Sequence, residues 1–173
     1  ILAHGDWLTM EHDGNHDGFL DMPKTTQYNV MNRWQYKTDT WFLQFGGKFL
    51  DETRLGGQKG FRKEMRGSYG EGTLYGIGID SRRYEGFLGY LMPQYENTSM
   101  AILVNYTDHD QDSYYGARDY QARQQTVFSN YIFQSIFGQN ENQKYSAGLS
   151  FNFDRYDESF NDYLVGSGQK TAT

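Results

Sequence analysis

The sequence contains no cysteine, no long apolar run and no cluster of basic residues. The absence of cysteine excludes disulfide frameworks, thiolate catalysis and zinc sites built on cysteine. No run approaches the roughly 18 apolar residues that a membrane-spanning helix needs, so no such helix is expected. The net charge is −6, from 16 basic and 22 acidic residues, and no basic stripe is present to follow a phosphate backbone. Nucleic acid is therefore not an expected partner.

Apolar residues are scarce, but aromatic residues are not. Mean hydropathy is −0.82 and 37% of the 173 residues are hydrophobic, yet 17% are aromatic. Disordered chains are poor in aromatic residues, so this composition argues against disorder. A β-sheet with one face toward water and the other toward lipid, bordered by aromatic girdles, has such a composition.

Alternation with a period of two residues, which is typical of β-strands, recurs along the chain, whereas helical periodicity is nowhere sustained. In the clearest case, KYSAGLSFNFD at residues 144–154, apolar residues alternate with small or polar ones from Tyr145 to Phe153. We expect about seven strands, at residues 2–12, 26–37, 40–52, 74–92, 98–109, 118–137 and 143–158. A length of about ten residues or more suits tilted strands that cross a bilayer. A change of apolar phase near Val127 predicts a bulge in the sixth strand.

The connections between these strands alternate in length. Short connections follow residues 37, 92 and 137, and the first of them contains a tight Thr38-Asp39 turn. Longer connections, rich in glycine or charge, follow residues 12, 52 and 109. Periplasmic turns and extracellular loops alternate in this way in bacterial outer-membrane barrels. A soluble immunoglobulin-like sandwich or a lipocalin-like barrel is the alternative, although sandwich strands are usually shorter and carry fewer aromatic residues.

Aromatic residues gather near the short connections. They are Trp34, Tyr36, Trp41, Tyr90 and Tyr95. This placement predicts an aromatic belt at the periplasmic membrane interface. The alternative is aromatic pairing across the strands of a soluble sheet.

Five segments carry a resemblance to a known family. In chain order they are DGNHDGFLDMP, QYNVMNRWQYK, FLDETRLGGQKGF, SRRYEGFLGYLMP and KYSAGLSFNFDRYDESFND. Together they resemble the barrel of TonB-dependent outer-membrane receptors, particularly the vitamin B12 receptor-like branch of Gram-negative bacteria. The resemblance implies an all-β, antiparallel transmembrane β-barrel of 22 strands closed around an N-terminal plug. Residues 1–173 would form a partial barrel domain of about seven strands, without a counterpart of the plug.

The start of the chain agrees with such a partial domain. The opening residues, ILAHGDW, contain no initiator methionine, charged segment or apolar segment of a signal peptide. The last residues, VGSGQKTAT, are small and polar. We therefore expect an internal piece of a larger protein.

The resemblance implies active transport across the bacterial outer membrane. Cargo such as cobalamin or a metal chelate binds at the extracellular face of such receptors, and the TonB complex of the inner membrane acts through the plug. The implied partners are outer-membrane lipid, the TonB complex, a surface lipoprotein and the small-molecule cargo. Substrate-binding residues remain unknown, because in this family they lie on variable outer loops and on the plug. No nucleophile elbow or other catalytic arrangement is present, so no enzyme activity is expected.

Two other functions remain open at this stage. One is a secreted, calcium-dependent β-sandwich module for binding or adhesion, and the other is a passive, porin-like channel. A sandwich must bury its large apolar residues against a second sheet, whereas a membrane barrel must expose them to lipid or detergent. The residues that distinguish these folds are Trp41, Leu43, Phe45, Phe49, Leu149, Phe151 and Phe153.

An acidic segment near the start of the chain has the spacing of a calcium loop. Counted from Asp13, the predicted ligands are Asp13, Asn15, Asp17, the Phe19 carbonyl and Asp21 at positions 1, 3, 5, 7 and 9. Gly18 occupies the position of the sharp turn, but Lys24 replaces the bidentate glutamate of position 12. Weak affinity, of about 10⁻⁴–10⁻³ M as in extracellular modules, is therefore expected. The alternatives are a solvated turn or a transition-metal site on His12 and His16 with Asp13 or Asp17.

A second acidic segment, TDHDQDSYYG, carries Asp108, Asp110 and Asp112 at alternate positions. It is predicted to be a loop on the same side of the barrel as residues 13–23. There it either supplies further ligands to a shared cation or forms a solvated rim.

Two glycine-containing segments are weaker candidates for ligand binding, the first of them for phosphate. GGQKG at residues 56–60 lacks the pattern of a Walker loop, and no helix is expected after it. In YGIGID, Gly76 and Gly78 lie within an expected strand, where they relieve crowding or allow a bend more readily than they bind a ligand.

Overall fold

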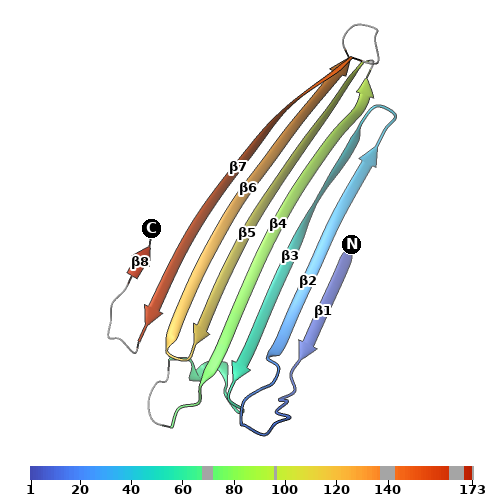
Figure 1. Ribbon diagram of the computed structural model, residues 1–173. Helices are drawn as coiled ribbons and strands as arrows, with labels where there is room; N and C mark the ends of the chain where they lie inside the picture. The colour runs from blue at the N-terminus through green and yellow to red at the C-terminus, as the bar shows by residue number, and fades with distance from the viewer. Residues whose placement is uncertain (68–71, 96, 137–142, 164–169, 173) are drawn as a thin grey trace.

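The computed structural model describes residues 1–67, 72–95, 97–136, 143–163 and 170–172, which form one antiparallel sheet with its strands in sequence order (Figure 1). The strands are β1 (Leu2–Leu8), β2 (Lys24–Lys37), β3 (Phe42–Gly57), β4 (Gly76–Tyr95), β5 (Thr98–Tyr115), β6 (Arg118–Ile136), β7 (Lys144–Asp162) and β8 (Lys170–Ala172). A 3₁₀ turn, η1 (Lys63–Met65), follows β3. The all-β prediction and the seven long strands are confirmed. Within the described ranges, no helix is long and apolar enough to span a membrane.

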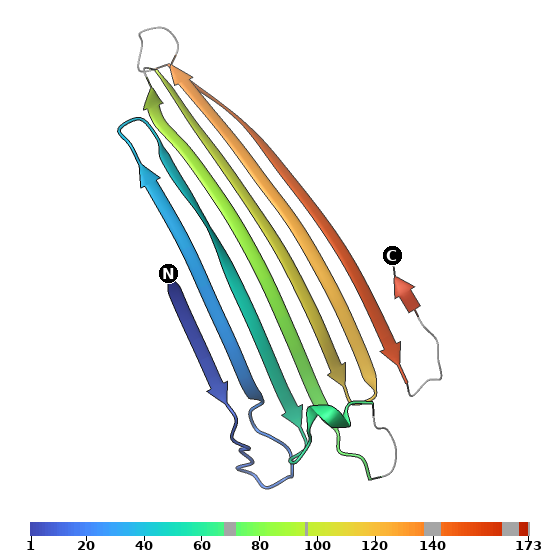
Figure 2. The ribbon, with the colours of Figure 1, turned by 180° about the vertical axis from the view of Figure 1, so that it is seen from behind.

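The sheet is a single layer (Figures 1 and 2). A compact protein of 20.2 kDa exposes about 8,800 Å², whereas this chain exposes 12,288 Å². Among the described residues, the buried apolar side chains are those of Phe61, Tyr114 and Ala117. The side chains of Leu149 and Phe151 are 72% and 56% exposed. The described part of the chain therefore has no second sheet and does not form the sandwich of the alternative prediction.

The two ends of the sheet differ in their connections, as the alternation of lengths predicts for two of the three long connections. The turn of residues 38–41 lies at one end, and residues 9–23, 58–67 and 72–75 lie at the other (Figure 1). Most of the short connection predicted after residue 137 lies outside the described residues.

Several predicted strand ends were wrong. β3 continues past residue 52 to Gly57, and β7 continues past residue 158 to Asp162. β1 ends at Leu8, so the acidic connection is longer than expected. β5 continues past residue 109 to Tyr115, and Gly116, at a φ of 60°, turns the chain directly into β6. The predicted long loop is therefore a two-residue turn, because the charged residues of β5 are paired across the sheet and remain in strand conformation.

The bulge predicted near Val127 is also absent, because the register of β6 with both neighbours is continuous there. Val127 pairs with Tyr106 and with Phe153. The apolar phase changes because Phe128 points to the opposite face from Val127. A register shift does occur between Met92 and Tyr95 of β4.

Both edges of the sheet are open. β1 pairs with β2 from Thr25 to Met31, and β8 pairs with β7 from Glu158 to Phe160. The rest of each edge has no strand partner among the described residues. The described sheet is therefore open, and it does not by itself form the predicted barrel of 22 strands.

Candidate functional site

The strand register assigns each residue to one of two faces, since antiparallel partners lie on the same side of a sheet. Val30, Phe49 and Tyr84 are successive partners across β2, β3 and β4, and we call their side face 1. Lys48 and Glu85 lie on the opposite side, face 2.

Face 1 carries a continuous band of apolar and aromatic residues in the half of the sheet nearest the short turns. This apolar band consists of Val30, Trp34, Tyr36, Leu43, Phe45, Phe49, Tyr84, Leu88, Tyr90, Met92, Met100, Ile102, Val104, Tyr106, Val127, Tyr131, Phe133, Tyr145, Ala147, Leu149, Phe151 and Phe153. The band is interrupted at Asn32, Gly47, Gly86 and Ser129. From Tyr145 to Phe153 the band extends about 27 Å along the strand. With strands tilted, this length is close to the ~25 Å apolar height of outer-membrane barrels.

Aromatic rings lie along the border of the band that is nearest the short turns. The ring of Trp41, in the turn of residues 38–41, lies 5.2 Å from that of Tyr36 and 6.1 Å from that of Tyr90. Trp34 lies on the same face two residues before Tyr36, so four of the five predicted aromatic residues lie near this turn, whereas the side chain of Tyr95 lies outside the described part. An aromatic border of this kind is typical of a membrane interface.

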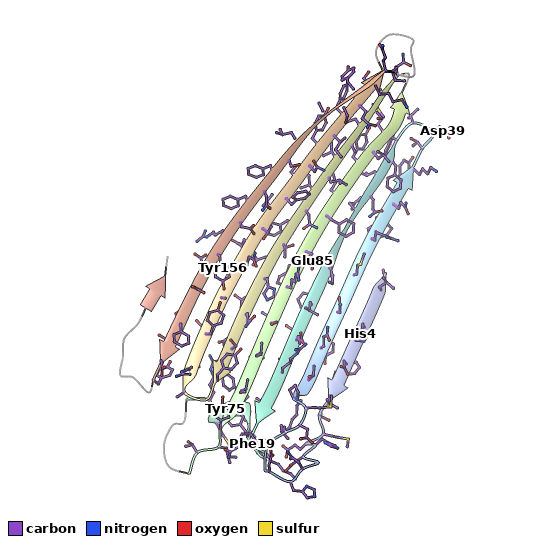
Figure 3. All side chains as sticks on the ribbon, viewed as in Figure 1. His4, Phe19, Asp39, Tyr75, Glu85 and Tyr156 are labelled. Carbon is purple, nitrogen blue, oxygen red and sulfur yellow. The ribbon has the colours of Figure 1, made fainter. Side chains whose placement is uncertain are left out.

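Face 2 is mainly polar behind the band. Glu85, labelled in Figure 3, lies 3.6 Å from the Lys48 ammonium and 2.9 Å from Nε of Arg83. Farther along the sheet, the Ser150 hydroxyl donates to the Asn130 side chain at 3.0 Å. Face 2 also carries apolar side chains, among them Phe87 and Leu91 of β4 and Leu103 of β5. The separation into an apolar and a hydrogen-bonding side is clearest in β7.

Beyond the band, residues 58–67 fold onto face 1, and we call this segment the strap. Phe61 is only 5% exposed, and its ring lies 6.0 Å from that of Tyr114. Lys63 forms an ion pair of 2.5 Å with Asp80. The strap and the strand ends beneath it thus form the small buried core of the described chain.

Arg66 anchors the strap through three groups. Its guanidinium donates two hydrogen bonds of 2.8 Å to Asp112 and one of 3.3 Å to Asp119. It also lies 4.8 Å above the ring of Tyr114. These bonds, chiefly those to Asp112, raise the pKa of Arg66 above its usual value.

Gly76 and Gly78 relieve crowding beneath the strap, as predicted. A Cβ atom at Gly76 would lie 2.1 Å from the Phe61 ring, and one at Gly78 would lie 2.2 Å from the Tyr114 ring. We expect Gly76→Ala to displace Phe61 at a cost of about 1–3 kcal/mol, as overpacking does. Tryptic cleavage within the strap should then accelerate. Gly86→Ala is the matched control, because no atom lies within 4 Å of its Cβ position; equal cleavage of both variants would contradict the packing role of Phe61.

The acidic loop of residues 9–23 brings together part of the predicted calcium set. The Asp13 carboxylate accepts hydrogen bonds from the backbone N–H groups of Asp17 and Gly18, both at 3.2 Å. The Asn15 amide donates to the Asp17 carboxylate at 3.0 Å, and Asp17 accepts from the Phe19 N–H at 2.8 Å. Gly18 has a φ of 84°, so it makes the predicted sharp turn.

Asp21 is engaged on another side of this loop. It accepts hydrogen bonds from the Gly14 N–H at 2.7 Å and lies 3.0 Å from Nδ1 of His12. These contacts, the Gly14 bond foremost, lower the pKa of Asp21. His16 instead contacts the Asp13 carbonyl at 2.9 Å, so the two histidines have different partners.

The carboxylates of this loop thus accept hydrogen bonds from the backbone N–H groups of the loop itself. Within the described ranges, no group of three or more histidine, aspartate or glutamate side chains is placed to hold a metal ion. The contacts agree with the solvated turn that was the alternative, and calcium binding remains a prediction.

The loop is also tied to the strap and to the end of β3. The Lys59 N–H donates to the Gly18 carbonyl at 2.8 Å, and the Leu20 N–H donates to the Gly57 carbonyl at 2.9 Å. Figure 3 places Phe19 of the loop and Tyr75 at the same end of the sheet, far from Asp39.

Calcium titration tests the acidic loop directly. We expect calcium to bind with a Kd of about 10⁻⁴–10⁻³ M, and the double substitution Asp13→Asn and Asp17→Asn to abolish the heat of binding in isothermal calorimetry. Asp39→Asn changes an aspartate at the opposite end of the sheet and should leave the heat unchanged. Absence of calcium-dependent heat from the parent protein would establish the solvated turn.

The second acidic segment is not a loop. Asp108, Asp110 and Asp112 lie in β5 and share face 1, as their alternation predicts. Asp108 accepts hydrogen bonds from Arg123 at 2.7 and 3.0 Å, and Asp112 is bound by Arg66. An ion pair within the sheet and one with the strap therefore occupy two of the three carboxylates.

Sequence reasoning missed the strap and its anchor, Arg66. The available signals were weak: one phenylalanine within a charged, glycine-rich segment, followed by two glycines in a strand.

Comparison with known proteins identifies no relative of this chain. No family model, curated protein or solved structure matches it. Functional inference therefore rests on the faces of the sheet and on its loops.

Proposed function

We propose that this chain is a sector of the wall of a bacterial outer-membrane β-barrel that imports a scarce nutrient as a TonB-dependent receptor. The apolar band is the observation that carries this proposal. Its side chains are large, half exposed or more in several cases, and in contact with no second layer of the described chain. In water such a surface is far larger than the apolar patches of soluble monomers, whereas lipid covers it at no cost.

The other features agree with this environment. Face 2 would line the lumen with polar groups, and the long connections would lie on the extracellular side. Further strands would pair with the open edges, because unpaired backbone groups are costly within a bilayer. The plug, the TonB complex, a surface lipoprotein, and cobalamin or a metal chelate as cargo follow from the sequence resemblance alone. A structural Ca²⁺ ion would occupy the acidic loop on the outside.

A passive, porin-like channel would share the same wall and is the second candidate. Nothing in the sheet favours it specifically. A calcium-dependent sandwich is disfavoured, because it requires the second sheet that the described residues lack.

The test is the source, mass and detergent dependence of the purified protein. We expect a species several times heavier than 20.2 kDa, recovered from outer membranes and soluble only with detergent. A monodisperse species of about this mass that is soluble without detergent would refute the membrane barrel. Energy-dependent accumulation of cargo, lost when TonB is deleted, would separate the receptor from a passive channel.

A further inference from the structure

Face 2, which would line the lumen of the proposed barrel, divides into two halves of different chemistry. On β2 to β4 it is rich in charged side chains, which are Arg33, Lys37, Lys48, Glu52, Arg54, Arg83 and Glu85. Lys48 and Arg83 both lie against Glu85, and Arg54 lies against Glu52. Ion pairs therefore dominate this half of the face.

The half of face 2 on β5 to β7 carries no lysine or arginine between the cross-strand rows of Ser150 and Phe160. Side chains with hydrogen-bonding groups and aromatic rings cover it instead, and we call them the polar strip. Its polar members are Asn105, Thr107, His109, Gln111, Gln124, Thr126, Asn130, Ser150, Asn152, Asp154 and Glu158, and its aromatic members are Tyr120, Phe128, Tyr156 and Phe160. From Ser150 to Glu158 the strip is about 27 Å long, and three strands make it about 10 Å wide.

Asp154, near the middle of the strip on β7, is held by uncharged donors. It accepts hydrogen bonds from the Thr126 hydroxyl, from the Gln124 amide at 3.3 Å and from the Asn152 amide at 3.1 Å. Among the described residues it has no ion-pair partner, whereas its neighbour Asp157 on face 1 is paired with an arginine. The strip therefore presents an oriented carboxylate without a cation.

Exposed rings lie beside the second carboxylate of the strip, that of Glu158. The side chains of Tyr156, labelled in Figure 3, and Phe160 are 53% and 43% exposed. The Tyr156 hydroxyl forms a hydrogen bond with that of Tyr120, which donates to Glu158 at 3.2 Å. Within the part of the chain that the structure describes, Glu158 also has no ion-pair partner. Aromatic surface and acceptor oxygens thus occur side by side.

From this arrangement we infer that the polar strip binds a neutral, linear oligosaccharide in the lumen. The inference rests on the proposed function, because face 2 borders a lumen only if the sheet is part of a barrel. Sugar rings have apolar C–H faces that can pack on exposed aromatic rings. Their hydroxyl groups donate to carboxylates and accept from amides, so they match both kinds of group in the strip.

Cargo of other charge or shape fits the strip less well. An anion would meet two carboxylates and no lysine or arginine. A polyamine only donates hydrogen bonds, so it would leave the amide and hydroxyl donors of the strip without acceptors. The long, narrow outline of the strip favours an extended chain of sugar units over a compact molecule.

Isothermal calorimetry on the protein purified from outer membranes in detergent tests the strip. The probes are neutral linear hexasaccharides of glucose, mannose, galactose or N-acetylglucosamine, with hexagalacturonate and spermidine as the anionic and cationic comparators. Tyr156→Ala is the test variant, and Tyr156→Phe keeps the ring. Phe153→Ala is the matched control, because Phe153 is 52% exposed on face 1 of the same strand.

We expect the parent, Tyr156→Phe and Phe153→Ala to bind at least one neutral hexasaccharide. Tyr156→Ala should bind it about tenfold more weakly, as the loss of one aromatic contact implies. No binding of any neutral probe by the parent, or equal affinities of Tyr156→Ala and Phe153→Ala, would overturn the inference. So would tighter binding of hexagalacturonate or spermidine. Recovery of the parent as a monodisperse species of 20.2 kDa without detergent would instead refute the proposed barrel.

Discussion

Val104→Arg is expected to lower the free energy of unfolding in a lipid bilayer by about 2–4 kcal/mol, because it places a charge on the lipid-facing side of the wall. Leu103→Arg should cost less than about 1 kcal/mol, because its side chain points to the polar face. The two residues are adjacent in β5 and similarly exposed, at 36% and 47%. Denaturant unfolding from liposomes measures both.

Comparison of Val104→Arg with Leu103→Arg tests whether the two faces of the sheet lie in different solvents. In a soluble sheet with both faces in water, the two arginines would be equally harmless. Equal effects of the two substitutions would therefore contradict the assignment of face 1 to lipid.

Arg66→Ala is expected to release the strap and to cost about 2–3 kcal/mol, somewhat less than the loss of one partner from a fully buried ion pair. The substitution leaves the carboxylates of Asp112 and Asp119 without their shared cation and removes the contact with Tyr114. Thermal unfolding and tryptic cleavage within residues 58–67 report the change.

Two further variants separate the contributions to this anchor. Arg66→Lys keeps the charge but cannot form the paired bonds to Asp112, so an intermediate loss is expected. Arg62→Ala removes an exposed neighbour and should have little effect. A strap that remains resistant to trypsin in Arg66→Ala would show that Phe61 alone holds it.

The fold was predictable where one face of a strand is apolar. The alternation from Tyr145 to Phe153 fixes both the strand and the side on which its large residues lie. β5 was cut short because the residues from Asp108 to Ser113 are polar on both faces, so no apolar period marks them as a strand. Its continuation is paired with β4 and β6 as far as Tyr115. Arg123, whose side chain binds Asp108, lies on another strand, so no local pattern reveals this pairing.

The candidate sites were likewise predictable from the sequence only where their contacts are local. The turn-forming part of the acidic loop was predictable from the spacing of Asp13, Asp17 and Gly18, whose contacts are all local. The position of Arg66 was not, because Asp112 and Asp119 are 46 and 53 residues away in the sequence. The row of cross-strand partners Asp51, Arg82, Asp110, Arg123 and Asp157 likewise requires the register of five strands, which no single segment reveals.

The assignment of face 1 to lipid is tested most directly by spin labels along β7. The chain has no cysteine, so single cysteines at positions 149–153 can be labelled without background. In liposomes, labels at Leu149, Phe151 and Phe153 are predicted to be accessible to oxygen and protected from a polar nickel chelate. Labels at Ser150 and Asn152 are predicted to show the reverse. Accessibility without this period of two residues would contradict the account of the sheet as a membrane wall.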